Sequence, residues 1–171
     1  GFIAVTKNLR NFLSRMKAVG SETFTSVSSP IQYAAIEAYT GDYNEYIVKT
    51  RNILNSVGRY VYNNLKSNNI LMNPPQGGFY LMPEFINSKF KTSIDLCDAI
   101  LNDTGVALLP GSAFGFNKSK MLTRLSYTDF DGSQFLKNIS GSERLGNDAI
   151  EKYAPNIVEG TNKLSEWSKN L

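Results

Sequence analysis

Histidine is absent from the 171 residues of this sequence. That absence excludes a Ser-His-Asp triad, a Cys-His pair, a histidine general base and a histidine-bearing zinc site within this chain. Cysteine is nearly absent too, because Cys97 stands alone, and this excludes an internal disulfide and a four-cysteine zinc site. Any catalytic chemistry must therefore come from lysine, tyrosine, serine, carboxylates or a cofactor, and no metal site is predicted.

Long apolar runs and a strong net charge are missing as well. No stretch approaches the roughly 20 apolar residues of a membrane-spanning helix. Lysine and arginine number 18 and aspartate and glutamate 15, and the net charge of +3 is too small to predict a nucleic acid or an acidic membrane surface as partner. The short apolar run at residues 1–5 follows no basic residues and is not typical of a signal peptide, so a cytoplasmic location is expected.

The first half of the sequence has the apolar spacing of helices. Hydrophobic residues make up 42% of the chain, which is enough for a core in one domain of ordinary length. A short strand over residues 2–5 is followed by a helix that Thr6 caps and that ends near Gly20, and a second helix begins around Pro30. Apolar side chains at spacings of three and four predict one long helix over residues 42–66, about 37 Å in length, which runs along an interface or joins two domains.

The second half alternates short strands with helices. A capping box at Thr92 and Asp95 begins a helix that Gly105 closes, and a last helix is predicted after a Thr161 cap. Three short strands are predicted, over residues 79–82, 106–109 and 123–127. This pattern predicts an α+β fold (α/β in the broad sense), in which helices cover a small sheet.

Three short motifs invite a chemical interpretation that their surroundings do not support. Ser112 lies near glycines, but the spacing differs from that of a G-x-S-x-G nucleophile elbow and no histidine is present to activate it. The run at residues 76–78 is followed by no Lys-Ser/Thr pair and no helix start, so a tight turn into a strand is expected rather than a phosphate-binding loop. Cys97 lies on the apolar face of a predicted helix and is expected to be a core residue rather than a nucleophile.

Arg124 is the residue whose position points to a ligand. It lies in a predicted strand, on the face opposite to that of Leu125 and in otherwise apolar surroundings. A strand arginine in such surroundings needs a partner, and its planar fork suits the two oxygens of a carboxylate. From the residues alone, a structural salt bridge or a plain exposed arginine stays open as the alternative.

Four separated segments resemble the C-terminal part of class I/II aminotransferases, the fold type I pyridoxal-phosphate enzymes. They occur in the same order as in that family, and the segment at residues 105–115 is the most specific match. The resemblance covers roughly residues 1–130 and the final helix. The segments are SSPIQYAA at residues 28–35, PQGGFYL at 75–81, GVALLPGSAFG at 105–115 and RLSY at 124–127.

The resemblance implies a functional role for one residue of this sequence. Arg124 matches the family's arginine that grips the α-carboxylate of the substrate, whereas no residue here is expected to be catalytic or to bind the cofactor or a metal. The implied cofactor is pyridoxal 5'-phosphate, whose attachment lysine and binding domain are expected to precede Gly1 in a longer protein. The chain by itself is therefore expected to be inactive.

The resemblance also implies how the chain is divided. Residues 1–29 are expected to be a remnant of the large cofactor-binding domain, residues 30–67 the region of a long interdomain helix, and residues 68–171 the C-terminal small domain. That domain is expected to hold a small, mostly antiparallel sheet covered by helices. The connection over residues 129–160 is longer than is usual in the family, so we interpret it as an insertion that either covers the site or serves oligomerisation.

The implied reaction is transamination. An amino group moves between an amino acid and a 2-oxo acid, while Arg124 holds the carboxylate and so orients the substrate. The complete enzyme is expected to act as a homodimer in amino acid metabolism, and its substrate amino acid is not readable from these residues. Two alternatives stay open: a related fold type I enzyme such as a carbon–sulfur lyase, in which Arg124 keeps its role, and a non-catalytic interaction module.

Overall fold

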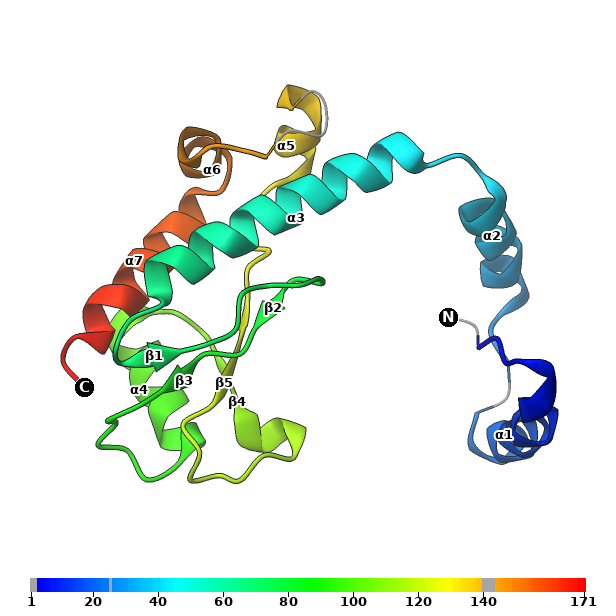
Figure 1. Ribbon diagram of the computed structural model, residues 1–171, viewed down its shortest axis with the longest axis horizontal. Helices are drawn as coiled ribbons and strands as arrows, with labels where there is room; N and C mark the ends of the chain where they lie inside the picture. Colours follow the sequence, from blue (N-terminus) through cyan, green and yellow to red (C-terminus); the bar gives the residue numbers. More distant parts are fainter. Residues whose placement is uncertain (1–2, 25, 140–143) are drawn as a thin grey trace. The chain divides into compact units, whose positions relative to one another are not determined.

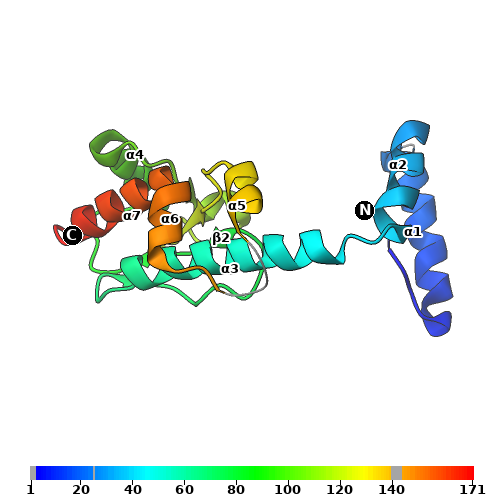
Figure 2. The same cartoon turned by 90° about the horizontal axis from the view of Figure 1, so that it is seen from above.

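A computed structural model of the protein describes residues 3–24, 26–139 and 144–171. The chain divides into two compact units, Gly1–Tyr43 and Asn44–Leu171, whose elements are labelled in Figures 1 and 2. Across the described residues no helix is long and apolar enough to cross a membrane. Nor does that part of the chain bring together three acidic or cysteine side chains in an arrangement that fits a metal ion.

The first unit is helical. Its elements are the short 3-10 helix η1 (Lys7–Leu9), α1 (Arg10–Thr23) and α2 (Ser29–Thr40). Thr6 precedes η1, but the predicted cap is wrong because its side chain makes no capping hydrogen bond, and α1 ends at Thr23 rather than near Gly20. Pro30 lies in the first turn of α2, as predicted. The strand predicted over residues 2–5 is wrong for its described part, residues 3–5, because no described strand pairs with this backbone.

The helices of the first unit form no core of their own. Neither α1 nor α2 contains a buried residue. Large apolar side chains on both helices are more than half exposed, among them Phe12 at 54% and Tyr33 at 74%. Two short helices with exposed apolar faces do not bury enough surface to be stable by themselves, so this unit needs a covering surface.

The second unit is built around the long helix α3 (Asn44–Leu65). It has 22 residues, or about 33 Å at 1.5 Å per residue, which confirms the predicted long helix with slightly narrower bounds. The face that α3 buries includes Ile53, Val57, Val61 and Leu65. Figure 1 shows α7 (Pro155–Ser168) lying along α3, and Figure 2 shows α6 (Asn147–Tyr153) against the same two helices.

Two small antiparallel sheets complete the core of this unit. One pairs β1 (Ile70–Leu71) with β3 (Glu84–Phe85), and the other has the order β2-β5-β4. The three strands of the second sheet are β2 (Tyr80–Leu81), β4 (Leu109–Pro110) and β5 (Thr123–Ser126). They confirm the predicted α+β architecture, although β4 shares only Leu109 with the strand predicted over residues 106–109, because β5 pairs with Leu109 and Pro110.

Helix α4 (Ser93–Thr104) follows its sequence signals. The Thr92 side chain accepts a hydrogen bond from the Asp95 backbone N–H at 3.1 Å, and Gly105 ends the helix with a φ of 75°. Both are as predicted, because a short polar side chain satisfies a free N–H at the start of a helix and glycine tolerates the left-handed turn at its end. The helix buries Leu96, Cys97 and Ile100.

The C-terminal helix begins earlier than predicted. We expected a Thr161 cap, but α7 starts at Pro155, where a proline loses no needed N–H, and Thr161 lies inside the helix with only 4% exposure. The segment over residues 129–160 contains α5 (Gly132–Asn138), α6 and the start of α7. Residues 140–143 lie outside the described chain, and the interpretation of this segment as an insertion stays a prediction, as does the division at residues 29 and 67.

Cys97 gives the core a measurable pH dependence. Its side chain is 6% exposed, and burial, assisted by the charge of Asp98, raises the pKa of the thiol to about 11. In the unfolded chain the thiol deprotonates near pH 8.5, so the stability that the neutral thiol contributes is complete below about pH 8.5 and is lost as pH rises towards 11. We expect the free energy of unfolding, measured by urea denaturation, to fall between pH 8 and pH 10.5. The fall should be about 1–2 kcal/mol larger in the wild type than in Cys97→Ala. Equal losses in the two proteins would contradict this assignment.

Candidate functional site

Strand β5 places Arg124 on the open face of its sheet. Thr123 and Leu125 point into the core and are 0% and 8% exposed, whereas Arg124 is half-buried and Ser126 is exposed. Side chains alternate along a strand, so a core on one face leaves the other face to Arg124. This is the placement predicted from the sequence.

Two aromatic rings contact the guanidinium of Arg124. Its Cζ lies 4.3 Å from the centroid of the Tyr80 ring and 4.3 Å from that of the Phe114 ring. Tyr80 lies on β2 opposite Ser126 and is therefore the diagonal neighbour of Arg124 on the same face. Phe114 ends the short 3-10 helix η2 (Gly111–Phe114), which follows β4 on the other side of β5.

Arg124 has no acidic partner in the described part of the chain. The ion pairs found there all involve lysine, and no side-chain hydrogen bond of Arg124 occurs among residues 3–24, 26–139 and 144–171. A structural salt bridge, one of the two alternatives left open by the sequence, is therefore not formed within these residues. A guanidinium carries five N–H donors and no acceptor, so an external carboxylate fits the group.

The turn that carries Phe114 is fixed against the strand that carries Arg124. The Gly111 backbone N–H donates to the Leu122 carbonyl oxygen at 2.7 Å. A Cβ at position 111 would lie 2.7 Å from that same oxygen, so glycine is the residue that permits this close approach. The Ser93 hydroxyl donates to the Ser112 hydroxyl at 3.3 Å, so Ser112 has a structural partner, in keeping with its exclusion as a nucleophile.

The turn before β2 is fixed by Tyr127. This side chain is 1% exposed, and its hydroxyl donates to the Gly78 carbonyl oxygen at 2.9 Å. Burial raises the pKa of Tyr127, which therefore stays a neutral donor. The bond connects the residue after β5 to the residues just before Tyr80, as expected for a tight turn that leads into a strand.

Sequence reasoning found Arg124 but missed its two aromatic neighbours. Tyr80 and Phe114 lie inside two of the segments that carried the family resemblance, yet neither was assigned a role. The contact of Tyr80 with Arg124 depends on the register of β2 against β5, and the contact of Phe114 depends on the path of the turn after β4. Neither can be obtained from the alternation pattern of a single strand.

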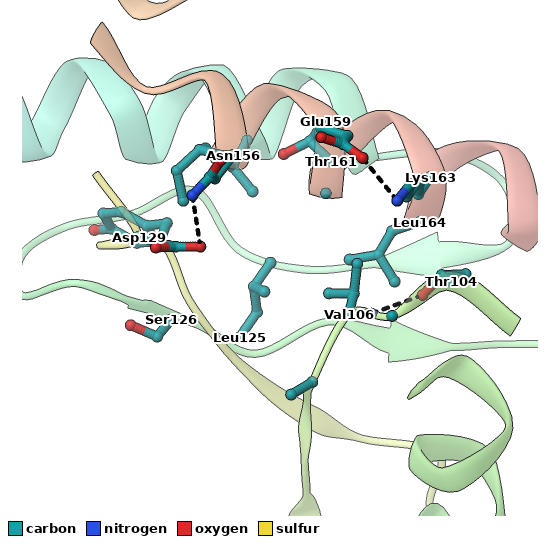
Figure 3. Close-up of a pocket in the computed structure, with 16 residues that line it drawn as sticks. Thr104, Val106, Leu125, Ser126, Asp129, Asn156, Glu159, Thr161, Lys163 and Leu164 are labelled. Carbon is teal, nitrogen blue, oxygen red and sulfur yellow. Dashed lines mark hydrogen bonds and ion pairs between the residues drawn. The ribbon is translucent and has the colours of Figure 1, made fainter. Parts of the chain in front are cut away.

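The second unit also contains a pocket. Its volume is about 410 Å³, and α7, β5 and the residues after α4 line it without any contribution from Arg124. Figure 3 shows the Asn156 amide donating to Asp129 at 3.4 Å and Lys163 paired with Glu159 at 2.7 Å. The lysine hydrogen bond lowers the pKa of Glu159. Because Lys163 already has a carboxylate partner, this pocket suits an anionic substrate less well than the face around Arg124 does.

The sequence of the chain is similar to those of aminotransferases. Residues 1–135 match the family model described as Aminotransferase class I and II. A Bacillus subtilis protein named "Probable N-acetyl-LL-diaminopimelate aminotransferase" is 32% identical over 114 residues, which are 67% of this chain and 28% of that protein. An aspartate aminotransferase of a Bacillus species is 31% identical over 122 residues, or 68% of this chain and 30% of the relative. The chain therefore spans about three-tenths of the length of the curated relatives it matches.

Solved structures agree on the fold. An alanine aminotransferase of Pyrococcus furiosus superposes with a TM-score of 0.62 at 22% identity, covering 95% of this chain and 34% of that one. An aspartate aminotransferase of Rhizobium meliloti gives 0.64 at 22% identity, covering 94% and 36%. These likenesses confirm the fold that the sequence predicted.

Proposed function

This chain belongs to the family of class I and II aminotransferases, and we propose that it is the C-terminal part of a pyridoxal-phosphate-dependent aminotransferase. The complete enzyme moves an amino group between an amino acid and a 2-oxo acid. The matched relatives are more than three times as long as the part they share with this chain, so the activity belongs to a longer protein.

One observation supports the proposal above all others. Arg124 presents its guanidinium on the open face of β5, in contact with two aromatic rings and without an acidic partner in the described chain. Amino acids and 2-oxo acids share a carboxylate next to the reacting carbon. A bidentate arginine recognises that group whatever the side chain is, and so suits an enzyme that must accept both.

The described residues do not supply a site for the cofactor itself. A lysine that forms a Schiff base needs an enclosed setting. Every described lysine is exposed except Lys49, which is half-buried and paired with Glu45 at 2.7 Å. We therefore assign cofactor attachment to sequence outside these residues, and derive no chemical step through the cofactor here.

The role of this chain is to bind and orient the substrate. Arg124 holds the carboxylate, and holding a substrate in its reactive geometry makes a large contribution to the rate even when the residue transfers no proton. The exposed apolar side chains of α1 fit a helix that another domain covers, which supports assigning residues 1–29 to a larger cofactor-binding domain. A cytoplasmic homodimer, as first expected, completes the proposal.

An amino-group transfer assay on the full-length protein tests the proposal. The protein, supplied with pyridoxal 5'-phosphate, is incubated with each of the common amino acids and with 2-oxoglutarate, and both glutamate and ammonia are measured. We expect glutamate to form with at least one amino acid and ammonia to stay at background. Ammonia release with a 2-oxo acid product would instead identify a carbon–sulfur lyase, and no turnover with any amino acid would identify an interaction module.

The isolated 171-residue chain serves as the companion test. We expect no glutamate formation from it under the same conditions, because the attachment lysine lies elsewhere. Turnover by this chain alone would contradict the assignment of the cofactor site to another part of the protein.

A further inference from the structure

We infer that Tyr80 and Phe114 are positioning residues, which hold the Arg124 guanidinium in one orientation for a carboxylate ligand. The inference rests on the proposed function of Arg124 and adds to it the residues that decide how well the arginine performs it. The two rings act through Arg124, and neither is a catalytic residue.

The geometry gives the rings a confining role. Tyr80 comes from β2 and Phe114 from the turn after β4, which are the segments on the two sides of β5. The Arg124 Cζ lies over each ring at 4.3 Å from its centroid, within the range of a cation–π contact. Rings on two sides limit the rotation of a long side chain that would otherwise sample many rotamers.

This arrangement leaves the hydrogen-bonding capacity of Arg124 intact. An aromatic face attracts a cation without accepting the in-plane N–H bonds that a carboxylate needs. An aspartate or glutamate partner would hold the arginine too, but would also compete with the ligand. Aromatic rings therefore orient the guanidinium and leave its donors available, which reduces the entropy lost when the carboxylate binds.

The exposure of the two rings fits this role better than a role in the core. Tyr80 is 42% and Phe114 40% exposed, so neither fills the interior of the unit. The turn before β2 and the turn that carries Phe114 are both held by other groups. The Tyr127 hydroxyl donates to the Gly78 carbonyl oxygen, and the Gly111 N–H donates to the Leu122 carbonyl oxygen. The scaffold around the rings thus keeps its own support when a ring is removed.

The test uses leucine and methionine variants of the full-length, cofactor-loaded enzyme. Tyr80→Leu and Phe114→Leu keep an aliphatic bulk and remove the ring face, and the methionine variants provide a second replacement if a leucine variant fails to fold. We expect each to raise KM for the amino acid about three- to tenfold, with kcat changed less than about twofold. Calorimetric binding of 2-oxoglutarate should weaken by a similar factor. Tyr80→Phe keeps the ring and should behave as the wild type.

Two controls separate positioning from general damage. Phe116→Leu removes an exposed aromatic side chain two residues beyond Phe114 that contacts no cation in the described chain, and should leave KM unchanged. In an Arg124→Ala background, Tyr80→Leu should cause no further loss, because a positioning residue acts only through the arginine.

The outcomes distinguish this inference from the proposed function. If Arg124→Lys weakens binding while the leucine and methionine variants bind like the wild type, the positioning role is wrong and the function of Arg124 stands. A loss that persists undiminished in the Arg124→Ala background also overturns the positioning role. If Arg124→Lys has no effect on binding, the proposed function of Arg124 fails first.

Discussion

Replacing Arg124 by lysine in the full-length enzyme should raise KM for the amino acid by about 10- to 100-fold, which corresponds to the loss of one charge-assisted hydrogen bond and its orientation. Lysine keeps the charge but has neither the planar fork nor the extended surface that lies over Tyr80 and Phe114. Arg124→Ala should lose more, because it removes the charge as well. Steady-state kinetics with the amino acid varied at saturating 2-oxo acid measures both effects.

An arginine-to-lysine substitution elsewhere in the second unit serves as the control. Arg59 donates from Nε to the Asn55 side chain at 3.1 Å within α3 and contacts no aromatic ring in the described chain. Arg59→Lys should leave KM within about twofold of the wild type, the scatter expected of a surface substitution. An unchanged KM in Arg124→Lys, or an equal rise in the two variants, would contradict a special role for Arg124.

Replacing Gly58 by alanine should destabilise the second unit by about 1–3 kcal/mol, the usual effect of overpacking a core. A Cβ at this position would lie 2.8 Å from Cζ and 2.9 Å from Oη of Tyr127. That ring is buried and its hydroxyl is bonded to Gly78, so it has little room to move. The cost of the contact should exceed the gain of up to about 1 kcal/mol that alanine brings to a helix interior.

Gly160 provides a matched control for this substitution. It lies inside α7 as Gly58 lies inside α3, but a Cβ there would meet Val106 at 3.7 Å, an ordinary contact. Gly160→Ala should therefore raise the free energy of unfolding by up to about 1 kcal/mol, so the two variants should shift in opposite directions. Thermal or urea unfolding of the 171-residue chain measures both, and shifts of the same sign would contradict the packing described around Tyr127.

Local chemistry made much of the fold predictable. Thr92, Asp95 and Gly105 determine the ends of α4 through hydrogen bonds and backbone freedom that involve only near neighbours in the sequence. The periodic apolar residues of α3 similarly predict a long helix. The start of α7 was missed, because Pro155 and Thr161 both carry helix-start signals and burial of Thr161 within the unit decides between them.

The candidate site shows the same division between local and long-range information. Alternation along β5 predicts that Arg124 and Leu125 face opposite sides, since this property belongs to one strand. Arg124 also contacts Tyr80 and Phe114, which lie 44 and 10 positions before it in the sequence. Such contacts depend on strand order and register, which the sequence pattern does not specify.

The most direct test of the account compares an amino acid substrate with the amine that differs from it only by the absence of the carboxylate. Binding of both is measured for the full-length wild type and for Arg124→Lys. If Arg124 holds the carboxylate, the variant should lose at least about tenfold in affinity for the amino acid and stay within about twofold for the amine. An equal loss for both ligands, or no loss for either, would contradict the assignment of Arg124 as the carboxylate-binding residue.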